Sequence, residues 1–284
     1  MNTVNWRTLF QELRTAAGDV VTEWARRSHR DSFGRDEALV EVIRPLFQFL
    51  YYHYFRVSVN GMAHLPLRGR AMIVANHSGT LPFDGAMMAL AVFNEHRTNR
   101  PVRFLVDDFV FDLPGVGWVI ERLGGMRASR ENATKMLKRG ELVAVFPEGV
   151  HGVGKFFDQR YQLKRFGHGG FVRIAMRTRT PIIPAAIIGA EEIYPLIGKS
   201  ERLAALCKLP YFPVTPTFPW LGPLGLVPLP TKWKIIFGKP VSFAASKPQD
   251  ADNEKLVAKK SEEIRSTVQR MIHQELKKRT SVWY

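Results

Sequence analysis

The chain has 284 residues, of which 45% are hydrophobic and 11% aromatic, which is enough to pack a core and too much for a disordered chain. Its single cysteine excludes an internal disulfide and any cysteine-rich zinc site. The formal net charge of +15 points to a polyanionic partner, which leaves nucleic acid, an anionic membrane surface or phosphorylated substrates.

Residues 1–58 are predicted to form an N-terminal helical region, and they lack the apolar core of a secretory signal. An apolar stripe recurs there at the spacing of an amphipathic helix: Trp6, Leu9, Phe10 and Leu13. The uncharged segment 45–55 follows, about half as long as the ~20 residues that a membrane-spanning helix needs. We therefore expect this region either to lean on a membrane or to cap the core.

From residue 59 to residue 284, apolar runs alternate with helical patterns, which predicts one α/β domain without an internal linker. The runs expected to form strands are 71–76, 102–106, 142–146, 181–189 and 232–238. Helices are expected at 85–95, 131–140 and 170–180. A C-terminal helix carries one apolar face: Val257, Ile264, Val268, Met271 and Ile272.

Residues 209–231 contain no charged side chain but seven prolines. The length suits a membrane, yet the prolines would break a spanning helix, and irregular backbone in hydrocarbon leaves its amides unsatisfied. Two interpretations stay open. The segment folds over an apolar pocket, or it dips several side chains into the lipid interface: Phe212, Phe218, Trp220 and Leu221.

The strand predicted at 71–76 ends at a histidine, His77, and a carboxylate, Asp84, follows seven residues later. In open α/β folds, chemistry concentrates at the carboxyl edge of the sheet. A neutral imidazole can take a proton from an alcohol near neutral pH, and Asp84 could accept a hydrogen bond from the other ring nitrogen. The alternative is structural, with His77 ending a strand and Asp84 capping the next helix.

The strand predicted at 142–146 ends in a similar way, since Glu148 and Gly149 follow it after one proline. Polar residues are therefore expected to meet where two strands end. The sequence contains neither the G-x-S-x-G nucleophile elbow nor the H-E-x-x-H zinc motif. These two general motifs are therefore excluded.

With these residues in place, the chain resembles the glycerolipid acyltransferases, which include the lysophosphatidic acid acyltransferases and a diacylglycerol acyltransferase-like branch. Four blocks match in order over roughly residues 57–240: Asn76-His77 with Asp84, "GGMRASR", "FPEGVHG" and "TPIIPAAI". Ordered blocks are more specific than any single motif. The resemblance implies a single mixed-sheet α/β domain with N-terminal amphipathic or apolar helices and a C-terminal helix.

The resemblance also implies an activity: transfer of an acyl group from acyl-CoA or acyl carrier protein to a lipid hydroxyl. His77 would be the general base and Asp84 its partner, with no metal and no cofactor. We expect the protein at the cytoplasmic face of a membrane, peripheral or monotopic, with no nucleic acid partner. A non-enzymatic alternative, in which Arg173, Arg177 and Arg179 contact nucleic acid phosphates, fits less well, because the aromatic residues cluster in uncharged segments. A thioesterase that uses water as acceptor is another alternative.

Substrate-binding roles are implied at six positions: Arg127, Arg130, Glu148, Gly149, Val150 and His151. Glu148 and Gly149 match residues that shape the acceptor site, while Arg130, assisted by Arg127, would contact phosphate.

The chain departs from the family pattern twice, with six residues rather than four between His77 and Asp84, and with Val150-His151 in place of Thr-Arg. The second departure removes a phosphate-binding guanidinium, which four later residues could replace: Lys155, Arg160, Lys164 and Arg165. They could equally be solvated loop residues. We expect a lysophospholipid acceptor, with a neutral acylglycerol or fatty alcohol as the alternative.

Overall fold

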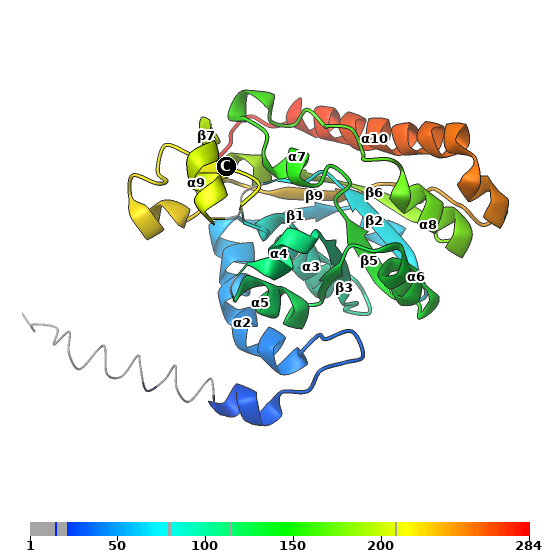
Figure 1. Ribbon diagram of the computed structural model, residues 1–284, viewed down its shortest axis with the longest axis horizontal. Helices are drawn as coiled ribbons and strands as arrows, with labels where there is room; N and C mark the ends of the chain where they lie inside the picture. Colours follow the sequence, from blue (N-terminus) through cyan, green and yellow to red (C-terminus); the bar gives the residue numbers. More distant parts are fainter. Residues whose placement is uncertain (1–14, 16–21, 79–80, 114, 208) are drawn as a thin grey trace, which may run out of the picture.

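The structure is a computed structural model that describes residues 15, 22–78, 81–113, 115–207 and 209–284. A seven-stranded sheet forms its centre (Figure 1), with the order β1-β9-β6-β2-β5-β3-β4. Its strands are β1 (Ser58–Asn60), β2 (Ala71–Ala75), β3 (Val102–Val106), β4 (Gly125–Arg127), β5 (Leu142–Val145), β6 (Ile182–Ile188) and β9 (Lys234–Phe237). All neighbours are parallel except β6 and β9. Strands β7 (Gly198–Ser200) and β8 (Phe212–Val214) form a separate antiparallel pair.

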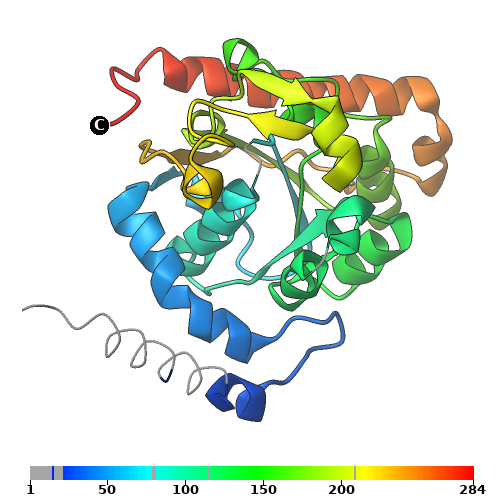
Figure 2. The same ribbon diagram turned by 60° about the vertical axis from the view of Figure 1, so that its left-hand side comes forward.

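Helices cover both faces of this sheet. The helices of the described residues are α2 (Glu37–Phe49), α3 (Phe83–Glu95), α4 (Asp108–Asp112), α5 (Val116–Arg122), α6 (Arg130–Lys138), α7 (Val150–Val153), α8 (Gly170–Thr178), α9 (Glu201–Cys207), which lies beside β7 and β8 (Figure 1), and α10 (Glu254–Leu276). Residues of α6, α8 and α10 pack with Val74 of β2, and residues of α3 pack with its neighbour Ile73 on the other face. This alternation is the period of two that a strand imposes on its side chains. Figure 2 shows α10 on one side of the sheet and α2 on the other.

The structure confirms the mixed α/β domain with a C-terminal helix, and the five strands and three helices predicted between residues 71 and 238 are present within two residues of their predicted ends. The sequence interpretation missed four short strands, β1, β4, β7 and β8. Each has only three residues, too few to display an apolar period. The predicted stripe of Trp6, Leu9, Phe10 and Leu13 lies outside the described residues.

One part of the segment 45–55 packs on the core and another part is exposed, so each of the two roles considered for it fits a different part. It continues α2 and then forms a π-helical turn, Leu50–Tyr54. Tyr51 and Phe55 are buried in the same cluster as Ile73, whereas the exposed residues of the segment include three with large apolar side chains: Leu46, Phe49 and Tyr52. The N-terminal region therefore packs into the core through one part of this segment. Its division from the domain at residue 58 stays a prediction.

The proline-rich segment 209–231 also has half-buried and exposed aromatic side chains. Phe212 and Phe218 are half-buried with ring centroids 5.3 Å apart, while Trp220 is 71% exposed. The segment lies beside the helical region, because the hydroxyl of Tyr54 donates to the carbonyl oxygen of Pro228 at 2.6 Å. In the part of the chain that the structure describes, no helix has both the length and the apolar character to cross a bilayer.

Candidate active site

The parallel strands of the sheet deliver polar residues to one edge. Following the sheet order, Glu191 comes after β6, His77 after β2, Glu148 after β5 and Asp107 after β3, while Arg127 ends β4. Parallel strands place their carboxyl ends together, and that edge is where α/β sheets bind ligands. The topology therefore gathers residues that are far apart in the chain.

His77 and Asp84 form a hydrogen-bonded pair at the centre of this edge. Nδ1 of His77 lies 2.7 Å from Oδ2 of Asp84, whose side chain is 1% exposed, whereas the imidazole is 22% exposed. Asp84 stands in the first turn of α3, and the backbone N–H groups of Ser78 and Gly85 donate to it at 2.9 and 2.7 Å. The ring of His77 stacks on Phe146 at 4.5 Å between centroids. The predicted hydrogen bond is present, and the carboxylate of Asp84 is fixed by His77 and by these two backbone N–H groups.

The electrostatics of the pair favour a basic imidazole. Burial lowers the pKa of His77, but the charge and hydrogen bond of Asp84, followed by the charges of Glu148 and Asp107, outweigh it and raise the pKa above its ordinary value. In the neutral ring, Nδ1–H donates to Asp84, so Nε2 carries the lone pair. That nitrogen can accept a proton from a bound hydroxyl group.

Two glycines allow the chain after β5 to pass close to His77. Gly149 adopts φ 55° and ψ −144°, a backbone conformation that favours glycine. A Cβ atom on Gly152 would lie 2.9 Å from Cβ of His77 and 2.7 Å from Cβ of Glu148, closer than such atoms approach. Gly149 precedes α7 and Gly152 lies within it; the same helix contains half-buried Val150 and exposed His151. The first turn after β5 therefore begins at the edge of the sheet where His77 lies.

Glu148 is buried behind His77. Its Oε1 accepts the backbone N–H of His77 at 3.0 Å, and its Oε2 accepts the backbone N–H of Lys164 at 2.8 Å. The ammonium of Lys155 lies 3.3 Å from Oε2 of Glu148 and 3.0 Å from Oε1 of Glu191. Lys155 is thus committed to two buried carboxylates. It neither replaces the missing arginine nor lies in solvent, so both interpretations of Lys155 are wrong.

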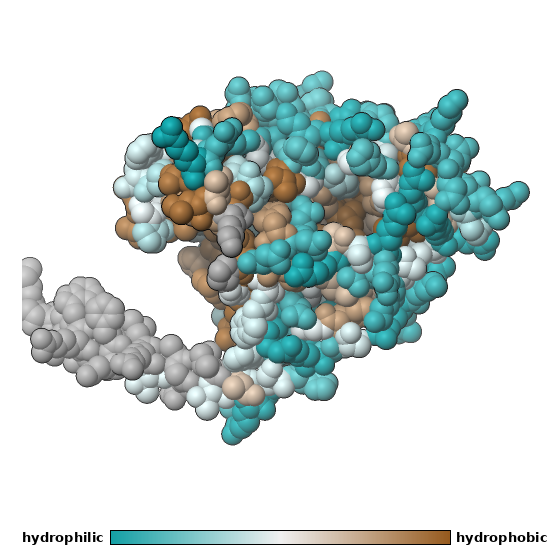
Figure 3. All heavy atoms as spheres, viewed as in Figure 1, coloured by the Kyte–Doolittle hydropathy of each residue, from teal (hydrophilic) through white to brown (hydrophobic). Residues whose placement is uncertain are grey.

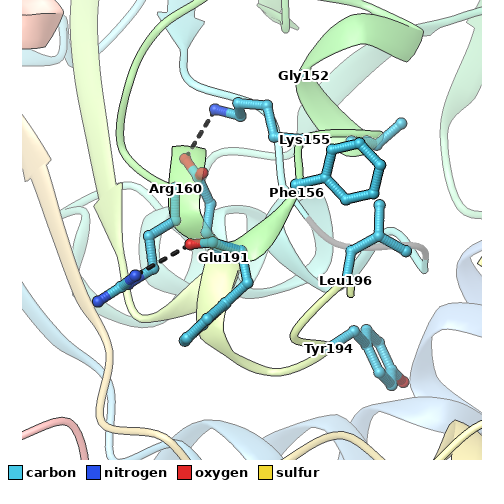
Figure 4. Close-up of a pocket in the computed structure, with 9 residues that line it drawn as sticks. Gly152, Lys155, Phe156, Arg160, Glu191, Tyr194 and Leu196 are labelled. Atoms are coloured by element: carbon cyan, nitrogen blue, oxygen red, sulfur yellow. Dashed lines mark hydrogen bonds and ion pairs between the residues drawn. The ribbon is translucent and has the colours of Figure 1, made fainter. Parts of the chain in front are cut away.

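A small pocket opens next to the ion pair of Lys155 and Glu191 (Figure 4). Its other lining residues include Phe156, Tyr194 and Leu196. Arg160, also at this pocket, donates to the carbonyl oxygen of Phe157 at 3.0 Å and lies over that residue's ring.

The two arginines of the second block lie at the far end of the edge. Arg127 is three strands away from β2 in the sheet, roughly 14 Å at the usual strand spacing. Its guanidinium lies 3.2 Å from Oδ1 of Asp108 and 3.3 Å from Oδ1 of Asp112. Arg130 begins α6 and is exposed. The structure thus brings His77, Asp84, Glu148, Gly149, Val150 and His151 together and leaves the arginines apart.

The sequence interpretation missed Glu191, and it did not predict that the Asn76 side chain joins two strands. The side-chain amide of Asn76 donates to the carbonyl oxygen of Ile187 at 3.0 Å and accepts the backbone N–H of Ile187 at 2.8 Å, which extends the pairing of β2 and β6. Glu191 follows β6 after one glycine and one alanine. The rule that identified His77 and Glu148, a polar residue just after a buried strand, also identifies Glu191.

Comparisons with known proteins find similar sequences and a similar fold. The family model described as Acyltransferase matches residues 56–188. An uncharacterized protein of Mycobacterium tuberculosis is 46% identical over 255 residues, which cover 89% of this chain and 71% of that protein. The "DGAT1/2-independent enzyme synthesizing storage lipids" of Gallus gallus is 29% identical over 52% of this chain and 42% of its own length. The structure of the 1-acyl-sn-glycerophosphate (LPA) acyltransferase PlsC from Thermotoga maritima superposes with a TM-score of 0.56 at 21% identity, covering 94% of this chain and 90% of that one.

Proposed function

The chain belongs to the glycerolipid acyltransferase family, and on this premise we propose that it moves a fatty acyl group from a thioester donor, acyl-CoA or acyl carrier protein, to a glycerolipid hydroxyl. One observation carries the proposal: the 2.7 Å contact between partly exposed His77 and buried Asp84 at the carboxyl edge of the sheet. A base held by a buried carboxylate is what direct attack by an alcohol requires.

In this scheme, Nε2 of His77 takes the proton of the acceptor hydroxyl while its oxygen attacks the thioester carbonyl carbon. Asp84 fixes the ring and stabilises the imidazolium that forms. The tetrahedral intermediate then collapses, the carbon–sulfur bond breaks, and the thiolate leaves with the proton from His77. The products are an ester and a free thiol, and the scheme uses neither a covalent enzyme intermediate nor a metal or cofactor.

A lysophospholipid is the first candidate acceptor. The net charge of +15 and the exposed Arg130 at the carboxyl edge favour a substrate that carries phosphate.

A neutral acylglycerol or fatty alcohol is the second candidate, favoured by a specific observation. The guanidinium of Arg127 already pairs with Asp108 and Asp112, and His151 stands where the family has arginine. Of the expected phosphate-binding arginines, one is therefore already paired with carboxylates and another is absent.

We further propose that the protein works at the cytoplasmic face of a membrane, peripheral or monotopic. Exposed apolar side chains of the described residues gather on α2, on α9 and in the proline-rich segment: Leu46, Phe49, Leu206, Trp220 and Leu224. Figure 3 shows apolar surface in brown on the side of the molecule where α9 lies.

Nucleic acid is less favoured as a partner, since Arg173 and Arg177 contact residues 251–254 of their own chain.

Product analysis tests the proposal most broadly. Purified protein is incubated with [¹⁴C]oleoyl-CoA and vesicles that contain either 1-oleoyl-lysophosphatidic acid or monoolein, and the lipids are separated. We expect a labelled ester that is absent with His77→Ala. Labelled free fatty acid as the main product would instead indicate a thioesterase.

A further inference from the structure

Three buried charges lie directly behind the catalytic base. Glu148, Lys155 and Glu191 are each less than a tenth exposed, and the single ammonium bridges both carboxylates. Burying charges is costly unless they are paired and hydrogen-bonded, so such a group is retained for a specific structural or chemical reason. The proposed chemistry does not use any of the three directly.

The contacts of Glu148 show which parts of the chain the three buried charges fix in place. One carboxylate oxygen accepts the backbone N–H of His77, and the other accepts the N–H of Lys164 together with the ammonium of Lys155. Both oxygens are therefore occupied by the protein, and the side chain has no exposed surface. A carboxylate in this state has no free oxygen to offer an acceptor lipid.

We propose that Glu148 and Lys155 are positioning residues for His77: the carboxylate fixes the backbone that carries the base, and the ammonium fixes the carboxylate. This role rests on the proposed function, and it replaces the acceptor contact that the family resemblance implies for Glu148.

The surrounding chain holds the same unit in place. The backbone N–H of Tyr161 donates to Glu191 at 2.8 Å, and the carbonyl oxygen of Tyr161 accepts from Gln269 of α10 at 2.8 Å. The loop that carries Lys155 is thus tied to α10 at one end and to the strand ends at the other. A rigid support of this kind keeps a catalytic side chain within tenths of an ångström of its working position.

The charge of Glu148 also acts on the imidazole. The groups that face His77 are Asp84 from α3, Glu148 after β5 and Asp107 after β3, all carboxylates. Each favours the imidazolium that forms during proton transfer. Glu191 is also a buried carboxylic acid side chain paired with Lys155, but it makes no hydrogen bond to His77, so it provides a matched control.

The test measures the titration of His77 by NMR in the full chain labelled with [¹³Cε1]histidine. The chain has eight histidines, and the signal of His77 is the one lost in His77→Gln. We expect Glu148→Gln to lower the titration midpoint by roughly one pH unit and Glu191→Gln to lower it by less than half as much. An equal shift in both variants, or no shift in Glu148→Gln, would overturn the proposal.

The double variant Glu148→Gln/Lys155→Met removes one charge of each sign and is used where the single variant folds poorly. Its midpoint should also fall, but by less than in Glu148→Gln, because removing the nearby positive charge of Lys155 partly offsets the loss of the carboxylate. An unchanged midpoint contradicts the proposal. The NMR measurement needs no turnover, so it tests the role of Glu148 alone. Full activity in His77→Ala would instead show that the proposed function is wrong.

Kinetics with oleoyl-CoA and the better of the two acceptors, lysophosphatidic acid or monoolein, supply the second readout. Glu148→Gln should lower kcat about tenfold, with the acceptor KM unchanged. A raised acceptor KM with normal kcat would mean that Glu148 contacts the acceptor after all.

Discussion

His77 depends on Asp84 for its orientation, because the 2.7 Å hydrogen bond at Nδ1 decides which ring nitrogen faces the substrate. Replacing Asp84 with asparagine preserves size but removes the charge that stabilises the imidazolium. We expect kcat to fall by about 10² or more, since a misoriented or wrongly protonated ring cannot act as base. Steady-state kinetics measure the loss. An unchanged thermal melting curve shows that the fold is intact, and normal turnover in Asp84→Asn would remove Asp84 from the mechanism.

The pH dependence of the reaction follows from the raised pKa of His77. Burial alone would lower this pKa, but the carboxylates of Asp84, Glu148 and Asp107 together raise it above the ordinary value of 6.5. Only the neutral ring acts as base, so kcat/KM should rise with pH and reach half its plateau above pH 6.5. A pH–rate profile measures this midpoint. A midpoint well below 6.5 would mean that burial dominates.

The His77–Asp84 pair was predictable because both residues lie in one short stretch around a single strand end. The partners of Glu148 were not predictable in this way. Lys155 reaches Glu191 across 36 residues, and nothing in the local sequence distinguishes a buried lysine from a solvated one. Burial there is decided by tertiary packing, which a residue pattern reports only indirectly.

At the level of elements, the central strands were predicted well because they are buried on both faces and therefore form continuous apolar runs. The edge strand β4 was missed for the opposite reason. It has three residues, begins with a glycine and ends with exposed Arg127. The sequence therefore located the centre of the site, and the structure was needed to place its rim.

The apolar side chains of the proline-rich segment are expected to bind lipid. Trp220 and Leu224 are 71% and 73% exposed, and transferring them partly into a lipid interface is favourable. Changing both to serine should weaken binding to anionic vesicles roughly 5- to 10-fold, measured by liposome flotation. Leu67→Ser is the control, because Leu67 is 50% exposed but precedes β2 at the amino end of the strand. Equal flotation of both variants would mean that this segment does not enter lipid.

For the whole molecule, the open question is how a strongly basic protein selects its acceptor. If the acceptor is a lysophospholipid, Arg130→Ala should lower kcat/KM for lysophosphatidic acid by roughly 10- to 100-fold, as expected for one charge-assisted hydrogen bond. Activity on monoolein should hardly change. Arg127→Ala is the matched control and should lose less, since Asp108 and Asp112 already pair with that guanidinium.

The donor must be saturating in this comparison, because CoA also carries phosphate groups, and an acyl-pantetheine donor serves as a phosphate-poor control. A loss confined to the donor KM would assign Arg130 to CoA. A preference of the wild-type chain for monoolein over lysophosphatidic acid would favour the neutral acceptor.

The most direct test of the account as a whole is the turnover of His77→Ala against that of the unaltered chain. Both are measured by release of free thiol from oleoyl-CoA at saturating donor and with the better acceptor. Loss of a general base should lower kcat by about 10² to 10⁴, while thioester binding and the melting curve stay close to those of the unaltered chain. A folded His77→Ala protein that turns over at the normal rate would contradict the assignment of His77 as the base.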